Sequence, residues 1–131
     1  MDIRWIQRLQ NFKRANTLLQ SSLKVENPSQ LERAGIIQFY EMAFELSWKT
    51  LKDYLTELGY EMSSPRQAIK QGFQSNILTE GHTWIKALED RNLTVHTYDE
   101  KKAIEVENDI RNLYAPQINQ LIKHLEAESQ L

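Results

Sequence analysis

The sequence predicts an all-α protein, a four- to five-helix up-and-down antiparallel bundle. Apolar residues recur at helical spacings along most of the 131 residues. Glycine and proline are scarce, with 4 and 3 copies, which disfavours a loop-rich or all-β fold. Helix caps or breakers separate the periodic segments. At this length we expect a single helical-bundle domain over residues 1–131, with room for one hydrophobic core.

The first expected helix covers residues 2–24. Its apolar residues are spaced by threes, fours and one heptad, which places them in a narrow seam along one side of a helix. These residues are Trp5, Leu9, Phe12, Leu19 and Leu23. Asn27-Pro28 follows and breaks the segment.

The second expected helix runs from Ser29 to Leu58. Ser29 and Glu32 form a capping box at its start, and Gly59 is a stop signal at its end. The helix is apolar on more than one face. Its main stripe is Ile37, Tyr40, Phe44, Leu51 and Leu55, and Ile36, Phe39, Ala43 and Leu46 widen it. Such a helix must be wrapped by others or buried in an interface. We expect a homodimer, because these faces exceed what a lone bundle of this size should cover.

A third, short helix is expected over residues 65–75. Ser64 is its capping serine and Pro65 takes the first helical position. Asn76 ends it. A further helical segment begins at about Glu80 and carries Trp84 and other apolar residues toward position 90. We expect Trp84 and Trp48 to be core or interface anchors rather than platforms for stacking bases.

The last expected helix starts at a second capping box, formed by Thr97 and Glu100. Its apolar positions include Ile104, Ile110, Leu113, Leu121 and Leu125. Pro116 lies inside it and should kink or interrupt it, because proline removes a backbone donor and clashes with the preceding turn.

Composition excludes several classes of function. The net charge of −2 argues against coating nucleic acid by bulk electrostatics, so any contact with RNA must be local. The absence of cysteine excludes disulfides and thiolate catalysis. No apolar run is long enough to cross a membrane, and the first residues lack the apolar core of a signal peptide. We therefore expect a cytoplasmic protein that does not bind membranes.

Motifs for cofactors and metals are also missing. The sequence holds no glycine-rich phosphate loop and no serine elbow. No histidine has a glutamate three residues before it, as a di-iron bundle requires. No Asp-x-Asp pair occurs, so the paired metal-binding carboxylates of a nucleotidyl-transfer enzyme are absent. We expect no metal and no cofactor, and the chain is not itself the catalytic subunit of a nucleotidyltransferase.

The stretch EDRNLTVHTYDE, residues 89–100, gathers the remaining chemical groups in the pattern Arg91-x-x-x-x-His96-x-Tyr98. On an unbroken α-helix, residues five apart are separated by about 140°, so Arg91 and His96 would not share a face. They converge only if the helix ends between them. Two β-branched residues at 94–95 and the cap at Thr97 favour such an end.

Two interpretations of this stretch stay open. In the first, His96 lies just before a helix N-terminus that favours phosphate, and an arginine fork adds contacts to it. Histidine titrates near neutral pH and suits proton transfer to or from a ribose oxygen without metal. In the second, the stretch is only the polar end of a helix. Asp99 and Glu100 also place negative charge where a phosphate would bind.

The pattern Arg91-x-x-x-x-His96-x-Tyr98 resembles the signature of the HEPN superfamily. The strings FYEMAFELSWKTLKDYLTELG, SPRQAIKQGF and WIKALEDRNLTVHTYDE resemble its branch of nucleotidyltransferase substrate-binding proteins. The resemblance covers residues 30–115 in the same order. It implies an all-helical homodimer, paired with a separate minimal nucleotidyltransferase that supplies the missing metal-binding carboxylates.

The resemblance also implies roles for individual residues. As a metal-independent endoribonuclease toxin, the chain would use His96 for proton transfer, Arg91 to stabilise the phosphate, and Asn92 as a polar helper. Tyr98 would receive AMP from the nucleotidyltransferase, which silences the toxin. The alternative is a noncatalytic subunit that presents an acceptor substrate to the nucleotidyltransferase.

Glu45 is a further candidate with two interpretations. Glu41, Glu45 and Lys49 stand at successive i,i+4 positions, which favours helix ion pairs worth a few tenths of a kcal/mol each. Alternatively, Glu45 faces a substrate cleft shared with the nucleotidyltransferase, where it would act as a general base toward an acceptor hydroxyl.

Overall fold

The computed structural model describes residues 4–91 and 98–130. Their helices are α1 (Arg4–Ser22), α2 (Gln30–Glu57), α3 (Pro65–Gln74), α4 (Gly81–Arg91), α5 (Glu100–Asp109), the π-helical segment η2 (Ile110–Tyr114) and α6 (Ala115–Ser129). No strand occurs within these two ranges. The predicted all-α bundle is therefore confirmed.

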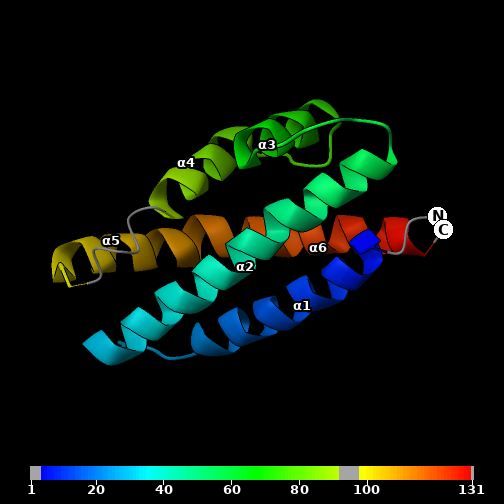
Figure 1. The fold of residues 1–131 in the computed structure, drawn as a ribbon. Helices are drawn as coiled ribbons and strands as arrows, with labels where there is room; N and C mark the ends of the chain where they lie inside the picture. The colour runs from blue at the N-terminus through cyan, green and yellow to red at the C-terminus, as the bar shows by residue number, and fades with distance from the viewer. Residues whose placement is uncertain (1–3, 92–97, 131) are drawn as a thin grey trace.

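The helices alternate in direction, as Figure 1 shows. α1 and α2 form a long antiparallel hairpin, and α5, η2 and α6 follow one another as a single long rod that crosses behind α2. α3 and α4 lie together on the side of α2 away from α1. α1 begins and α6 ends at the same end of the bundle, while α5 begins at the opposite end.

The predicted caps of α2 and α3 are confirmed. Ser29 accepts a hydrogen bond from the Glu32 amide, and the Glu32 carboxylate accepts one from the Ser29 amide. Gly59 follows the end of α2 with φ at 102°, a conformation that glycine adopts without strain. The Ser64 hydroxyl accepts from an amide of the first turn of α3, just after Pro65.

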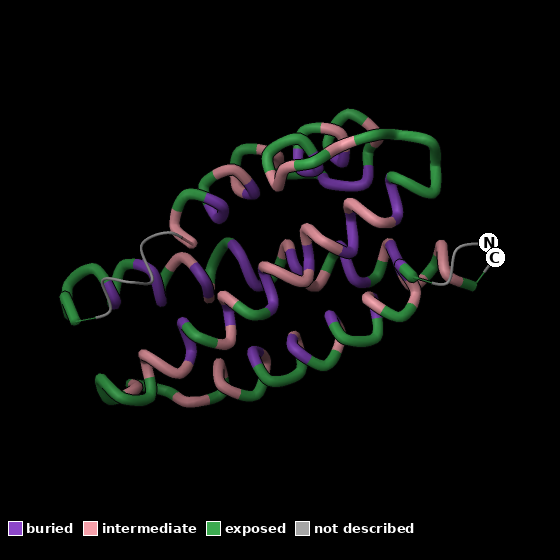
Figure 2. Tube along the Cα trace, viewed as in Figure 1, coloured by how far each residue is buried: buried purple, intermediate pink, exposed green. Residues whose placement is uncertain are grey.

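Most of the broad apolar surface of α2 is covered within one chain. Buried residues alternate with exposed ones along all the long helices in Figure 2 and face the interior. α2 contributes eight residues to the hydrophobic core: Ile36, Ile37, Tyr40, Ala43, Phe44, Leu51, Tyr54 and Leu55. Trp84 is buried and Trp48 packs against this core, as anchors should. The apolar faces of α2 thus give little reason to expect a dimer, and the homodimer stays a prediction.

Pro116 alters the last helix without breaking it. The five residues of η2 precede α6, and the Ala115 amide donates to the Ile110 carbonyl in the i→i+5 pattern of a π-helix. A proline ring clashes with the carbonyl four residues before it in a regular α-helix. The wider turn in front of Pro116 relieves that clash, so the rod continues to Ser129.

The predicted start of the last helix is wrong by two residues. The sequence pattern favours Thr97 as the cap, but the helix begins at Glu100 and Asp99 caps it, its carboxylate accepting from the Lys102 amide at 3.3 Å. Aspartate and threonine are both good capping residues, and aspartate is the stronger acceptor because it is charged. Thr97 itself lies outside the described residues.

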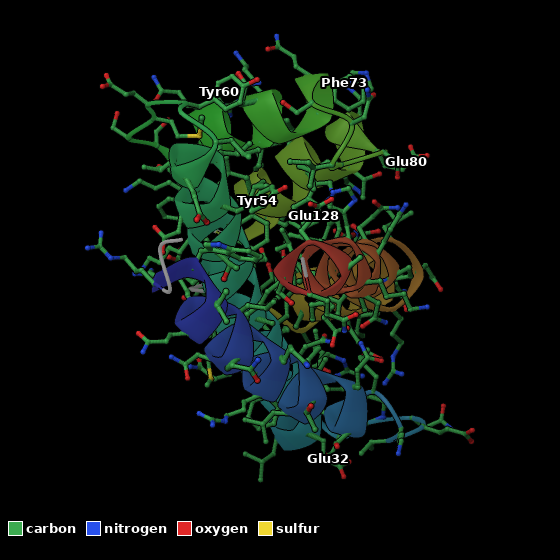
Figure 3. All side chains as sticks on the ribbon, turned by 90° about the vertical axis from the view of Figure 1, so that its right-hand side faces the viewer. Glu32, Tyr54, Tyr60, Phe73, Glu80 and Glu128 are labelled. Carbon is green, nitrogen blue, oxygen red and sulfur yellow. The ribbon has the colours of Figure 1, made fainter. Side chains whose placement is uncertain are left out.

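A buried tyrosine lies at the end of the bundle at which α1 begins. Tyr54 of α2 and Glu128 of α6 lie near each other in Figure 3. Burial, followed by the charge of Glu128, raises the pKa of Tyr54. This pair lies at the opposite end of the bundle from the start of α5.

Candidate functional site

Arg91, the last residue of α4, pairs with Glu45 in the middle of α2. The Arg91 Nη1 atom donates to Glu45 Oε1 at 2.5 Å. The other oxygen of Glu45 accepts from Trp48 Nε1 at 3.2 Å, and Lys49 Nζ lies 3.7 Å from it. The predicted i,i+4 pair with Lys49 therefore exists, but the shorter contact is to Arg91. The carboxylate of Glu45 fixes the guanidinium on the outer side of the bundle.

Two buried tyrosines hold the last turns of α4 in place. The Tyr40 hydroxyl donates to the Ala87 carbonyl at 2.8 Å, and the Tyr114 hydroxyl donates to Asp90 Oδ2. The two rings stack with centroids 5.5 Å apart. Burial, and then the Asp90 carboxylate, raises the pKa of both phenols well above the usual value. Both hydroxyls stay protonated and act as donors, so the backbone that carries Arg91 is held from α2 and from η2.

Tyr98 lies on the other side of the α4–α5 junction, just before the cap of α5. Its side chain is 77% exposed. It lines a groove together with Gln30, Leu31 and Ala34 from the first turns of α2. Leu31 is 84% exposed. The hydroxyl-bearing ring is thus presented at the surface beside an apolar patch.

A network of arginines holds the start of α5 against the turn between α1 and α2. Glu107 is 6% exposed and accepts from Arg33 Nε at 2.8 Å and from Arg111 Nε at 2.7 Å. Arg33 also pairs with Glu100. Arg111 reaches the carbonyls of Leu23 and Val25 at 2.7 and 2.8 Å. Burial opposes the charge of Glu107, but the hydrogen bonds from the two arginines outweigh it and lower the pKa of Glu107.

The structure places only some of the site residues that were predicted from the sequence. Arg91 and Tyr98 flank the junction, and both flanks are anchored to the bundle. Glu45 is brought to Arg91 from 46 positions away. Asn92 and His96 lie outside the described residues. Within 4–91 and 98–130, no cluster of three or more histidine or acidic side chains is arranged to hold a metal ion.

The anchoring residues were not predicted. Tyr40 was expected only as part of an apolar stripe and Tyr114 was not singled out, while Asp90 and Glu107 gave no signal beyond their charge. A buried tyrosine needs a hydrogen-bond partner, which is the one general rule that would have pointed to these contacts. In the two described ranges, no helix is long and apolar enough to cross a membrane.

Comparisons with known proteins agree with the fold and the motifs. A family described as nucleotidyltransferase substrate binding protein like matches residues 7–127. A solved structure from Thermus thermophilus superposes with a TM-score of 0.83 at 33% identity, covering 87% of this chain and 98% of the other. The probable ribonuclease HepT of Haemophilus influenzae is 28% identical over 78 residues, which is 56% of this chain. The match spans about half the length of that relative, 53%.

Proposed function

Because the chain belongs to the family of nucleotidyltransferase substrate-binding-like proteins, we propose that it is the HEPN subunit of a two-component system. It acts as a metal-independent endoribonuclease toxin, and a separate minimal nucleotidyltransferase regulates it by transferring AMP to Tyr98. The observation that carries the proposal is the placement of the two ends of the signature. Arg91 is held by Glu45 at the end of α4, and Tyr98 is exposed just before α5, while His96 lies outside the described residues.

The chemistry follows from the residue types. A phosphodiester is bound by the guanidinium of Arg91, which also stabilises the charge that develops on the phosphate oxygens. His96 removes the proton from the 2′-hydroxyl, whose oxygen attacks the phosphorus to form a 2′,3′-cyclic phosphate, while the bond to the 5′-oxygen breaks and that oxygen takes up a proton from water. Asn92 supplies a further polar contact. Cleavage of this kind needs the 2′-hydroxyl of RNA and no metal ion.

The surroundings of Tyr98 support its role as the modified residue. A side chain that is 77% exposed is open to a second protein, and the apolar patch of Leu31 and Ala34 beside it offers contact area. In the transfer, the phenolic oxygen attacks the α-phosphorus of ATP and pyrophosphate leaves. The new phosphate then lies two residues from His96 and competes with RNA for Arg91.

The proposal extends to the assembly and its location. The relative from Haemophilus influenzae carries the name of a ribonuclease, which favours RNA as the substrate. A homodimer would place two copies of Arg91 and His96 near each other and would raise the local positive charge that a chain of net charge −2 lacks. The pair acts in the cytoplasm.

We expect the purified chain, without its partner, to cleave end-labelled RNA in excess EDTA. Treatment with the nucleotidyltransferase, ATP and Mg²⁺ before the EDTA should add the mass of one adenylyl group and stop cleavage. Tyr98→Phe should cleave RNA at an unchanged rate but should gain no mass and stay active after the same treatment, because it has no phenolic oxygen.

The assay has two internal controls. An RNA with a 2′-deoxy nucleotide at the cleaved position should stay intact, and Tyr60→Phe, another exposed tyrosine, should be silenced as the native protein is. Absence of cleavage by an unmodified chain, verified by intact mass, would remove the ribonuclease assignment.

The family description also favours a second function, a noncatalytic subunit that presents an acceptor substrate to the nucleotidyltransferase. Glu45 would then be a general base. Both of its oxygens already accept hydrogen bonds, from Arg91 and from Trp48, which makes it less suited to that task. Tight binding to the partner without RNA cleavage, together with transfer of AMP to a small acceptor, would establish this function instead.

A further inference from the structure

Two polar contacts join the last turns of α4 to the last residue of α5 and the last residue of η2. Lys86 Nζ lies 2.9 Å from Asp109 Oδ2, and the Tyr114 hydroxyl donates to Asp90 Oδ2. Lys86 and Asp90 are an i,i+4 pair and therefore share one face of α4. Asp109 and Tyr114, by contrast, are five positions apart. Side chains five positions apart on the rod thus both reach α4.

The π-helical segment explains how residues five positions apart can face the same helix. In an α-helix, five residues turn the chain about 140° beyond a full turn, so Asp109 and Tyr114 would point in different directions. η2 has the i→i+5 hydrogen bonding of a π-helix, which brings residues five apart closer to one column. Asp109 and Tyr114 then face α4 together. Tyr114 is 1% exposed and stacks on Tyr40, so its hydroxyl has a fixed position.

We propose that Tyr114 is a positioning residue for Arg91, and that the π-helical segment η2 turns Tyr114 toward α4. Its hydrogen bond to Asp90 fixes the residue that directly precedes Arg91, while Glu45 holds the guanidinium from α2. The backbone and the side chain of Arg91 are thus restrained from two different helices. This inference rests on the proposed ribonuclease function, in which Arg91 must meet the phosphate in one defined geometry.

We expect Tyr114→Phe to lower kcat for RNA cleavage about tenfold, since small displacements of a catalytic group cost up to about 100-fold. KM should change by less than about twofold, because the hydrogen bond that is removed joins two groups of the protein and does not contact the RNA. Asp90→Ala should behave like Tyr114→Phe. Asp90→Asn should keep near-native kcat, because the amide oxygen still accepts the bond from the hydroxyl.

Tyr54→Phe is the matched control. It also removes the hydroxyl of a buried tyrosine that lies near a carboxylate, that of Glu128, but at the far end of the bundle. A merely structural role for Tyr114 predicts that both variants lose similar stability and keep the same kcat. A positioning role predicts that only Tyr114→Phe loses kcat.

A second measurement does not depend on activity. In a ¹H–¹⁵N spectrum, the Nε–Hε resonance of Arg91, assigned by its absence in Arg91→Lys, should shift or broaden in Tyr114→Phe and stay in place in Tyr54→Phe and Asp90→Asn. If the native chain does not cleave RNA, the proposed function fails, and this resonance still decides the positioning role. An unmoved resonance in Tyr114→Phe, or an unchanged kcat, would overturn the inference.

Discussion

Replacing Arg91 with alanine is expected to lower the rate of RNA cleavage by about 100-fold or more, the usual loss when a transition-state donor is removed. Arg91→Lys should recover only part of the rate, because an ammonium keeps the charge but not the planar fork that matches a phosphate. His96→Ala should lose a comparable factor, since general acid–base catalysis contributes about 10²–10⁴-fold. Initial rates in EDTA on one defined RNA substrate measure all three.

These losses should occur without unfolding. The pair of Arg91 and Glu45 is partly exposed, with 23% and 35% of the side chains accessible, and such pairs contribute at most about 1 kcal/mol to stability. Arg66→Ala, an exposed arginine on α3, is the control and should cleave at the native rate. Equal activity of Arg91→Ala and Arg66→Ala would show that the signature arginine plays no part in the chemistry.

Local rules explain which parts of the fold were predictable. The cap at Ser29 depends on Glu32 three residues away, and the stop at Gly59 depends on one backbone conformation. Both are encoded within a single turn of helix, so the sequence is sufficient. The start of α5 was missed because Thr97 and Asp99 are competing caps two residues apart, and the local pattern alone did not rank them.

Only the contiguous signature of the candidate site could be predicted from the sequence. The pattern of Arg91, His96 and Tyr98 is contiguous, but the contacts that hold Arg91 come from Glu45 and Tyr114, 46 and 23 positions away. Such pairings depend on how the helices cross, which periodicity does not specify. The broad apolar surface of α2 illustrates the same limit, because counting its apolar faces could not reveal that helices of the same chain cover most of them, and the homodimer itself stays a prediction.

The effect of Pro116 could be predicted only in part. The sequence identifies Pro116 as a disturbance, because its missing donor and its ring conflict with a regular helix. Whether the chain forms a kink, a break or a wider turn depends on the tertiary contacts that the surrounding residues make in each case. Here the π segment lets Asp109 and Tyr114 face α4 together, so tertiary contacts favour the wider turn.

Removing the Glu107 side chain is expected to be the most destabilising single change considered. Glu107→Ala leaves Arg33 and Arg111 without the buried carboxylate that they share, and breaking such a buried pair costs about 3 kcal/mol or more. Glu105→Ala, an exposed glutamate on the same helix, should stay within about 0.5 kcal/mol of the native protein. Urea unfolding at neutral pH compares the two, and equal midpoints would contradict a structural role for Glu107.

Glu107 also makes the stability of the folded protein depend on pH, and the direction of its pKa shift fixes the sign of that dependence. The folded protein holds the pKa of Glu107 below its ordinary value, so the folded state binds fewer protons at this group than the unfolded state. Its contribution to stability is complete above the unfolded value of about 4.3 and is lost as the pH falls through the lower, folded value. The stability difference between the native protein and Glu107→Gln should therefore be constant from pH 7 to about pH 5 and shrink below about 4.3. A difference that stays constant throughout would mean that the two arginines do not stabilise the charged form, and the anchoring of α5 would then depend on packing alone.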